Sequence, residues 1–186
     1  MKYFTLLFFI AIGAFSYGQQ LIVTPDGLRD AEDIEKTYVV INAEGKTANQ
    51  LYDNALKFIN KNYKSPDDVI KGNIQGEYLK FITHVPDFLV VNNSGAKILI
   101  DADYTIELNF KDGKAKYEII FLDMYWQNGP YKVLFTGGAL EGYIIYNKKG
   151  ELKRPETKTD IENFFNAQIE SITEFLSGKS EKDEWI

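Results

Sequence analysis

Residues 100–120 read IDADYTIELNFKDGKAKYEII, and this stretch decides the fold because it contains two strand-like segments and the turn between them. Asp112 and Gly113 are typical of a two-residue type I′ hairpin turn, in which both central residues need positive φ. From Ala96 to Phe110, every second residue is apolar or aromatic. That alternation predicts a strand with one buried face. The stretch therefore predicts an antiparallel hairpin folded about Asp112 and Gly113.

The turn also predicts the register of the hairpin, starting from Lys111 opposite Lys114. On one face this register pairs apolar side chains, namely Tyr104 with Phe121, Ile106 with Ile119 and Leu108 with Tyr117. On the other face it places Asp101 opposite Met124, Asp103 opposite Leu122, Thr105 opposite Ile120 and Glu107 opposite Glu118. The acidic residues alternate because their positions point away from the core.

These carboxylates do not predict a metal site. Glu107 and Glu118 form a like-charge pair, but two carboxylates fall well short of the six to eight oxygens that calcium prefers. Asp101 and Asp103 resemble the start of a calcium loop, yet Ile106 occupies the position where such a loop needs glycine. His84 is the only histidine and the chain has no cysteine, so no zinc site of the usual composition is expected. We predict no metal and no cofactor.

The rest of the chain supplies two helices and several further strands. Thr47 and Gln50 form a capping box that predicts a helix, and residues 65–70 predict one extra helical turn. A second capping box, Thr159 with Glu162, predicts a carboxyl-terminal helix that ends at Gly178. Further strands are expected at residues 37–41, 78–85, 131–135 and 142–147.

The amino-terminal sequence predicts export. Residues 1–18 contain a basic residue, an apolar run and small residues before Gln19, which is the layout of a secretory signal peptide. Cleavage would leave a loose acidic leader at 19–36, one domain at 37–178 and a charged tail at 179–186. The apolar run falls short of the about 20 residues that span a membrane, so we expect no integral membrane segment after cleavage.

Composition narrows the compartment and the partners. The chain has no cysteine at the cleavage site, so it is not expected to be a lipoprotein. We expect a soluble protein, in the periplasm or outside the cell. The formal charge is −6, which argues against nucleic acid as a partner because nucleic-acid-binding surfaces are basic.

Two segments carry a resemblance to a known family. GKTANQLYDNALKFINKNYKSPDDVI, residues 45–70, and KDGKAKYEI, residues 111–119, resemble an exported Bacteroidota family of unknown function that has a TATA-binding-protein-like fold. The chain departs from the family in having Phe58 where tryptophan is expected, and Ala115 and Lys116 where an aromatic or arginine pair is commoner. The resemblance implies no catalytic residues and no DNA binding, because function depends on sites and not on folds.

The order of elements agrees with the fold that the resemblance implies. A strand, a helix, a run of antiparallel strands and a second helix predict an α+β protein with both helices on one face of the sheet. The alternative is a helix-grip ligand-binding barrel, in which the last helix would close a curled sheet around a cavity.

For function, the sequence favours a non-catalytic binding or structural module over an enzyme. The predicted register places a set of apolar residues on the face away from the helices: Leu99, Ile120, Leu122, Met124 and Trp126. Either residues 19–36 or 127–150 cover this face, or a protein partner or second copy binds it, with Trp126 as the anchor. The alternative is a carboxylate-dependent hydrolase that uses Asp101 and Asp103.

Overall fold

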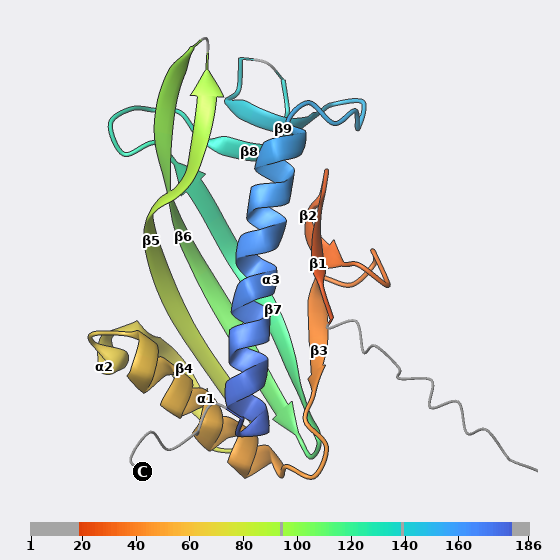
Figure 1. Ribbon diagram of the computed structural model, residues 1–186, viewed down its shortest axis with the longest axis vertical. Coiled ribbons are helices and arrows are strands. Elements are labelled where there is room, and N and C mark those ends of the chain that lie inside the picture. The colour runs from red at the N-terminus through yellow and green to blue at the C-terminus, as the bar shows by residue number, and fades with distance from the viewer. Residues whose placement is uncertain (1–18, 94, 139, 180–186) are drawn as a thin grey trace, which may run out of the picture.

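The computed structural model describes residues 19–93, 95–138 and 140–179 (Figure 1). In chain order, the elements are β1 (Leu21–Thr24), β2 (Gly27–Asp30), β3 (Tyr38–Asn42), α1 (Ala48–Asn62), α2 (Pro66–Val69), β4 (Ile70–Ile74), β5 (Tyr78–Asn93), β6 (Ala96–Lys111), β7 (Lys114–Tyr125), β8 (Val133–Gly137), β9 (Tyr143–Asn147) and α3 (Pro155–Ser177). The expected helices and strands are therefore all present. The signal-peptide prediction, residues 1–18, lies outside the described residues.

One antiparallel sheet of five strands, in the order β3-β7-β6-β5-β4, forms the body of the protein. The long helix α3 runs along one face of this sheet, and α1 packs on the same face beside the carboxyl-terminal end of α3 (Figure 1). The predicted α+β class with two helices on one sheet face is confirmed. The helix-grip alternative is wrong, because the sheet is open and ends in β3 on one side and β4 on the other.

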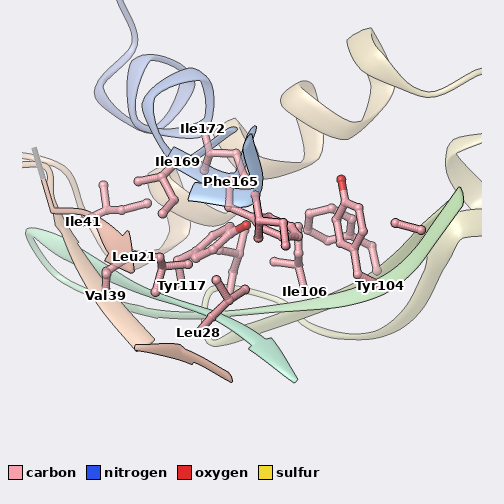
Figure 2. Packing of buried hydrophobic residues seen from close by; sticks show 14 of the residues in the cluster. Leu21, Leu28, Val39, Ile41, Tyr104, Ile106, Tyr117, Phe165, Ile169 and Ile172 are labelled. Atoms are coloured by element: carbon pink, nitrogen blue, oxygen red, sulfur yellow. The ribbon is translucent and has the colours of Figure 1, made fainter. Parts of the chain in front are cut away.

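The core lies between the sheet and the helices. Figure 2 shows Tyr104, Ile106 and Tyr117 of the sheet beneath Phe165 and Ile169 of α3. The two tyrosines keep their hydroxyl groups satisfied through one residue of α3: Tyr117 donates to Oε1 of Gln168 at 2.8 Å, and Nε2 of Gln168 donates to the hydroxyl of Tyr104 at 2.8 Å. Burial raises the pKa of both hydroxyls well above the ordinary value.

The turn between β6 and β7 connects the sheet to α1. Gly113 has φ of 77°, but Asp87 is the single described non-glycine residue with positive φ. Asp112 therefore keeps negative φ, and the predicted type I′ turn is wrong. The side chain of Asp112 instead accepts a hydrogen bond from the amide of Ala48 at 2.8 Å, next to the confirmed capping box of Thr47. The turn thus helps to cap α1.

The predicted register of the hairpin holds near the turn and fails beyond it. Lys111 lies opposite Lys114, Leu108 opposite Tyr117 and Ile106 opposite Ile119, as expected. Between Ile106 and Thr105 the register shifts by one residue, so that Thr105 lies opposite Phe121 and Tyr104 opposite Leu122. An extra residue of this kind is a β-bulge, and it exchanges the two faces of the strand that follows.

A second irregularity occurs in β5, between Val85 and Leu89. Pro86, which predicted a bend, lies within it, and Asp87 has φ of 53°. The amide of Asp87 donates to Oδ1 of Asp101 on β6 at 3.0 Å. The strand therefore continues past the proline to Asn93, well beyond the predicted end at residue 85.

The region predicted as a loose leader, residues 19–36, contains the antiparallel hairpin of β1 and β2. Leu21, Val23 and Leu28 are buried in the core. Side chains of α3 also bind the backbone of β1. Oδ1 of Asn166 accepts from the amide of Leu21 at 2.8 Å, and Nδ2 of Asn166 donates to the carbonyl of Leu21 at 3.0 Å. Glu162 accepts from the amide of Val23 at 2.8 Å. The leader prediction missed this hairpin because the acidic composition of residues 30–35 outweighed the short apolar alternation before them.

The same contacts explain why the start of α3 was mispredicted. The helix begins at Pro155, with Arg154 as N-cap and no side-chain cap, about one turn before the predicted capping box of Thr159 and Glu162. Proline suits the first helical position, and Glu162 binds β1 and Lys158 instead of capping the helix. The predicted end is confirmed, because Gly178 is the C-cap with φ of 74°.

Strands β8 and β9 pair in parallel and lie beside the amino-terminal end of α3 (Figure 1). An isolated bridge from Tyr125 to Lys132 connects this small sheet to the end of β7.

None of the described helices is both long enough and apolar enough to cross a membrane. Most of the charged tail, residues 180–186, lies outside the described residues.

Candidate binding surface on the outer face of the sheet

The structure separates the five residues predicted to form a binding face. Leu99 of β6 is about half exposed on the side away from the helices, directly opposite Val90 of β5, and Ile120 is exposed at the bulge. Leu122 and Met124 lie on the helix side, and Met124 is only 2% exposed. The predicted outward orientation of Leu122 and Met124 is wrong, because the bulge shifts β7 by one residue after Ile119.

Trp126 also follows the shifted register and packs, half-buried, against the core. Its ring stacks on that of Tyr131 with 5.9 Å between centroids. A Cβ added to Gly129 would lie 2.3 Å from the indole, so the loop from 126 to 131 can close over Trp126 only because residue 129 is glycine. Trp126 is therefore held by its own loop and packs against the core.

The outer face instead has an apolar centre across β5, β6 and β7. Ile82, Thr105 and Phe121 lie side by side in register, and Ile120 is next to Phe121 at the bulge. Ile82, Ile120 and Phe121 are 39%, 45% and 53% exposed. We call Ile82, Ile120 and Phe121 the apolar row. The sequence analysis assumed an unbroken register and therefore placed Phe121 on the core face. The alternation in residues 78–85 had already placed Ile82 on the outer face.

On the turn side of the apolar row, a set of charged residues crosses the same strands. Glu107 and Glu118 lie opposite each other, as predicted. Glu107 accepts a hydrogen bond from the hydroxyl of Tyr78 at 2.6 Å, and burial followed by this contact raises the pKa of Tyr78 to about 12. Glu118 accepts from Lys116 at 2.6 Å and from Thr37.

These contacts determine the pKa of Glu118. Partial burial raises the pKa of this carboxyl, but the hydrogen bonds from Lys116 and Thr37 outweigh burial and leave the pKa below its ordinary value. The like-charge pair is thus accommodated by donors of the chain itself, from β5, from β7 and from Thr37 just before β3.

On the far side of the apolar row lies a second charged set. Asp103 is the centre: its Oδ1 lies 2.9 Å from Nδ1 of His84, and its Oδ2 accepts from the hydroxyl of Tyr125 at 2.9 Å. That bond, followed by burial, raises the pKa of Tyr125. Asp123, opposite Asp103, forms an ion pair with Lys132 at 2.7 Å. The apolar row is therefore bordered on both sides by charged side chains fixed by hydrogen bonds.

The two carboxylates proposed for hydrolysis have different surroundings. Asp101 is only 4% exposed, and its Oδ1 binds the amide of Asp87, while its Oδ2 has no hydrogen-bond partner among the described atoms. Asp103 is half exposed and bound to His84 and Tyr125. No group of three or more His, Cys, Asp or Glu that could hold a metal is found in the part of the chain that the structure describes. Asp103 thus forms a His–Asp pair with His84, whereas Asp101 binds the backbone at the irregularity of β5.

Comparisons with known proteins agree with the fold. Residues 38–123 match the model of a domain of unknown function (DUF4468) with TBP-like fold. A crystal structure of a DUF4468 family protein from Bacteroides ovatus is similar over 75% of this chain and 84% of that chain, with 15% identity and a TM-score of 0.55. A TBP-like protein from Parabacteroides distasonis is similar over 74% of this chain and 90% of that chain, with 14% identity and a TM-score of 0.48.

No curated protein matches the chain. At 15% identity the Bacteroides ovatus structure indicates the fold alone. The family match begins at β3 and ends within β7, so it includes the outer sheet face but not the β1–β2 hairpin, the β8–β9 pair or α3. The resemblance to the DUF4468 family of unknown function, and the TBP-like fold that it implies, are confirmed for residues 38–123.

Proposed function

We propose that this protein is an exported, non-catalytic binding module, and that the apolar row is the centre of a surface that binds another protein. The observation that supports this most strongly is the joint exposure of Ile82 on β5 and of Ile120 and Phe121 on β7, on either side of Thr105 of β6. Antiparallel sheets that face water on one side normally alternate apolar and polar residues. Three large apolar side chains together on the solvent side are therefore unusual for a face that only meets water.

The surroundings of the apolar row fit a protein interface. Interfaces commonly have an apolar centre and a polar rim, and here Glu107 and Glu118 lie on one side and Asp103 and Asp123 on the other. Their hydrogen bonds hold these rim side chains in place before a partner arrives, which lowers the entropy lost on binding. A preformed sheet face of this kind suits a protein better than a small molecule, because small-molecule sites are concave.

Export is part of the proposal and is supported by the sequence of residues 1–18. The expected mature protein begins at Gln19, two residues before β1. The intact mass of the protein recovered from its native host checks this. A mass that includes residues 1–18 would contradict export by signal cleavage.

The binding surface can be tested by photo-crosslinking in the native host. A photo-reactive phenylalanine analogue at position 121 should give a discrete covalent adduct, and mass spectrometry of the adduct shows whether it contains a different protein or a second copy of this chain. The same analogue at the exposed position of Lys64 on the helix side is the matched control. The adduct should disappear when Ile82→Ser is added. Equal adducts from positions 121 and 64, or none from position 121, would contradict the proposal.

A further inference from the structure

A cavity of about 850 Å3 lies on the helix side of the sheet, between the far ends of β5 and β6 and the β8–β9 pair. Val91, Ile98 and Ile100 line it from the sheet, and Tyr143 and Ile144 line it from β9. Sites for small molecules generally enclose about 300–1,000 Å3 and have mainly apolar walls. The cavity has both properties, and we call it the basic cavity for the reason that follows.

Every charged side chain that lines the basic cavity is a cation, namely Lys132, Lys148, Lys149, Lys153 and Arg154. This local excess opposes the composition of the chain, whose formal charge is −6. Three of the cations are neutralised by carboxylates outside the lining: Lys132 by Asp123 at 2.7 Å, Lys148 by Glu141 at 2.6 Å and Lys153 by Glu151 at 2.8 Å. In the described ranges, Lys149 and Arg154 have no carboxylate partner.

Arg154 is the better fixed of the two cations without a carboxylate. Its guanidinium lies 4.7 Å from the centre of the Tyr143 ring, a cation–π contact that holds the group over the wall of the cavity. Arg154 is also the N-cap of α3, a helix of 23 residues with no side-chain cap. The amino-terminal end of a helix carries partial positive charge, so the backbone adds to the potential of the side chains. Glu156 in the first turn is exposed and does not line the cavity.

We propose that the basic cavity binds a small amphiphilic anion, with a carboxylate or phosphate group bound to Arg154 and Lys149 and a hydrocarbon body along the partly exposed side chains of Ile98, Tyr143 and Ile144. The guanidinium of Arg154 presents several N–H donors in one plane, which matches the oxygens of either anionic group. The apolar wall excludes water from the rest of the ligand, and this burial adds to the affinity in proportion to the chain length. A purely polar anion would leave that wall uncovered and should bind weakly.

This site is independent of the proposed protein-binding surface. The basic cavity lies on the helix side of the sheet and uses β8, β9 and the start of α3, whereas the apolar row faces away from the helices. Loss of one activity by substitution should leave the other unchanged, so a failed test of either proposal does not decide the other.

The test is isothermal titration calorimetry of the purified protein with dodecanoate and dodecyl phosphate, both kept below their micellar concentrations. Both should bind at one site. Dodecyltrimethylammonium tests the charge of the ligand, and acetate and inorganic phosphate test the need for a hydrocarbon body. We expect the two amphiphilic anions to bind at least about tenfold more tightly than these three compounds, the factor that one charge-assisted hydrogen bond or a few buried methylene groups contribute.

Substitutions assign the binding to the cavity. Arg154→Ala and Lys149→Ala should each weaken dodecanoate binding about tenfold. Arg154→Lys should weaken it less than Arg154→Ala. Ile98→Thr should weaken the binding of dodecanoate and leave the binding of acetate unchanged. Lys97→Ala, an exposed lysine outside the cavity, is the matched control and should bind as wild type. Lys149 is exposed in a turn, so its variant should fold, and the melting temperature of each variant verifies folding. Equal binding of the cationic amphiphile, no binding of either anion, or wild-type affinity in Lys149→Ala and Arg154→Ala would overturn the proposal.

Discussion

The two faces of the five-stranded sheet are made from the same strands, yet they differ in what explains their composition. On the helix side, residues such as Tyr104, Ile106 and Tyr117 are buried beneath α3, and folding alone accounts for them. On the outer face, Ile82, Ile120 and Phe121 are about half exposed. These three keep about half of their surface in water, so folding accounts only in part for their being apolar. This difference is what makes the outer face, and not the better packed inner one, the candidate for function.

The largest expected effect tests this contrast directly. Phe165→Ala should lower the free energy of unfolding by about 3–5 kcal/mol, because Phe165 is fully buried and its ring packs against Tyr104 with 5.3 Å between centroids. Phe121→Ala removes the same atoms from the outer face and should cost less than about 1 kcal/mol. Urea unfolding of both variants measures the difference. Similar losses would mean that the outer face is also part of the stabilising core.

The sequence predicted the inner face better than the outer one, and the reason is the bulge in β7. Alternation from Ala96 to Phe110 and the turn at Gly113 determine one face of β6 and the register close to the turn. Residues 119–122 are four consecutive apolar residues, so alternation is lost there and a one-residue shift leaves no clear pattern. That shift moved Met124 into the core and Phe121 out of it. The loss of alternation was the available signal that the register beyond Ile119 could not be extrapolated.

The attachment of the β1–β2 hairpin to α3 could not be predicted either, because it depends on contacts between residues far apart in the sequence. Asn166 lies 145 positions from Leu21 in the chain. From the sequence alone, Asn166 and its polar neighbours on α3 predict only a side of the helix that faces water. The basic cavity shows the same limit, since Lys149 and Arg154 join Val91 and Ile98 only through the packing of β8 and β9 on the sheet.

The second prediction concerns the attachment of the amino-terminal hairpin to α3. Asn166→Ala removes both hydrogen bonds to the backbone of Leu21 and should lower the free energy of unfolding by about 1–3 kcal/mol. Hydrogen exchange at residues 21–23 should accelerate more than in the five-stranded sheet. Asn163→Ala, one turn away and exposed, is the matched control and should have little effect. Unchanged exchange in Asn166→Ala would show that apolar packing alone holds the hairpin.

The third prediction uses pH to examine the charged set near the turn. The pKa of Glu118 in the folded protein lies below its ordinary value, so this carboxylate adds stability above the unfolded-state pKa of about 4.3. That contribution is lost as the pH falls from there through the folded-state pKa. Glu118→Gln should remove about 1 kcal/mol near neutral pH, and its melting temperature should fall less than that of wild type on acidification. Parallel curves for the two proteins would mean that Lys116 and Thr37 do not stabilise the ionised form.

The smallest effect is expected for Glu107→Gln, on the same charged set. This change removes the like-charge contact with Glu118, which favours the variant by a few tenths of a kcal/mol. It also replaces the charged acceptor of the Tyr78 hydroxyl by a neutral one, which weakens a hydrogen bond of 2.6 Å. The two effects oppose each other, so the free energy of unfolding should change by less than about 0.5 kcal/mol.

A spectroscopic titration gives this variant a clear readout even though its stability barely changes. The pKa of Tyr78 is raised to about 12 by burial and then by Glu107, so ultraviolet titration should show one tyrosine ionising at lower pH in Glu107→Gln than in wild type. Millimolar calcium separates this account from a metal site, because the carboxylates already have donors from the chain. A calcium-dependent rise in melting temperature that disappears in Glu107→Gln would show that a cation, and not Tyr78 and Lys116, relieves the repulsion between Glu107 and Glu118.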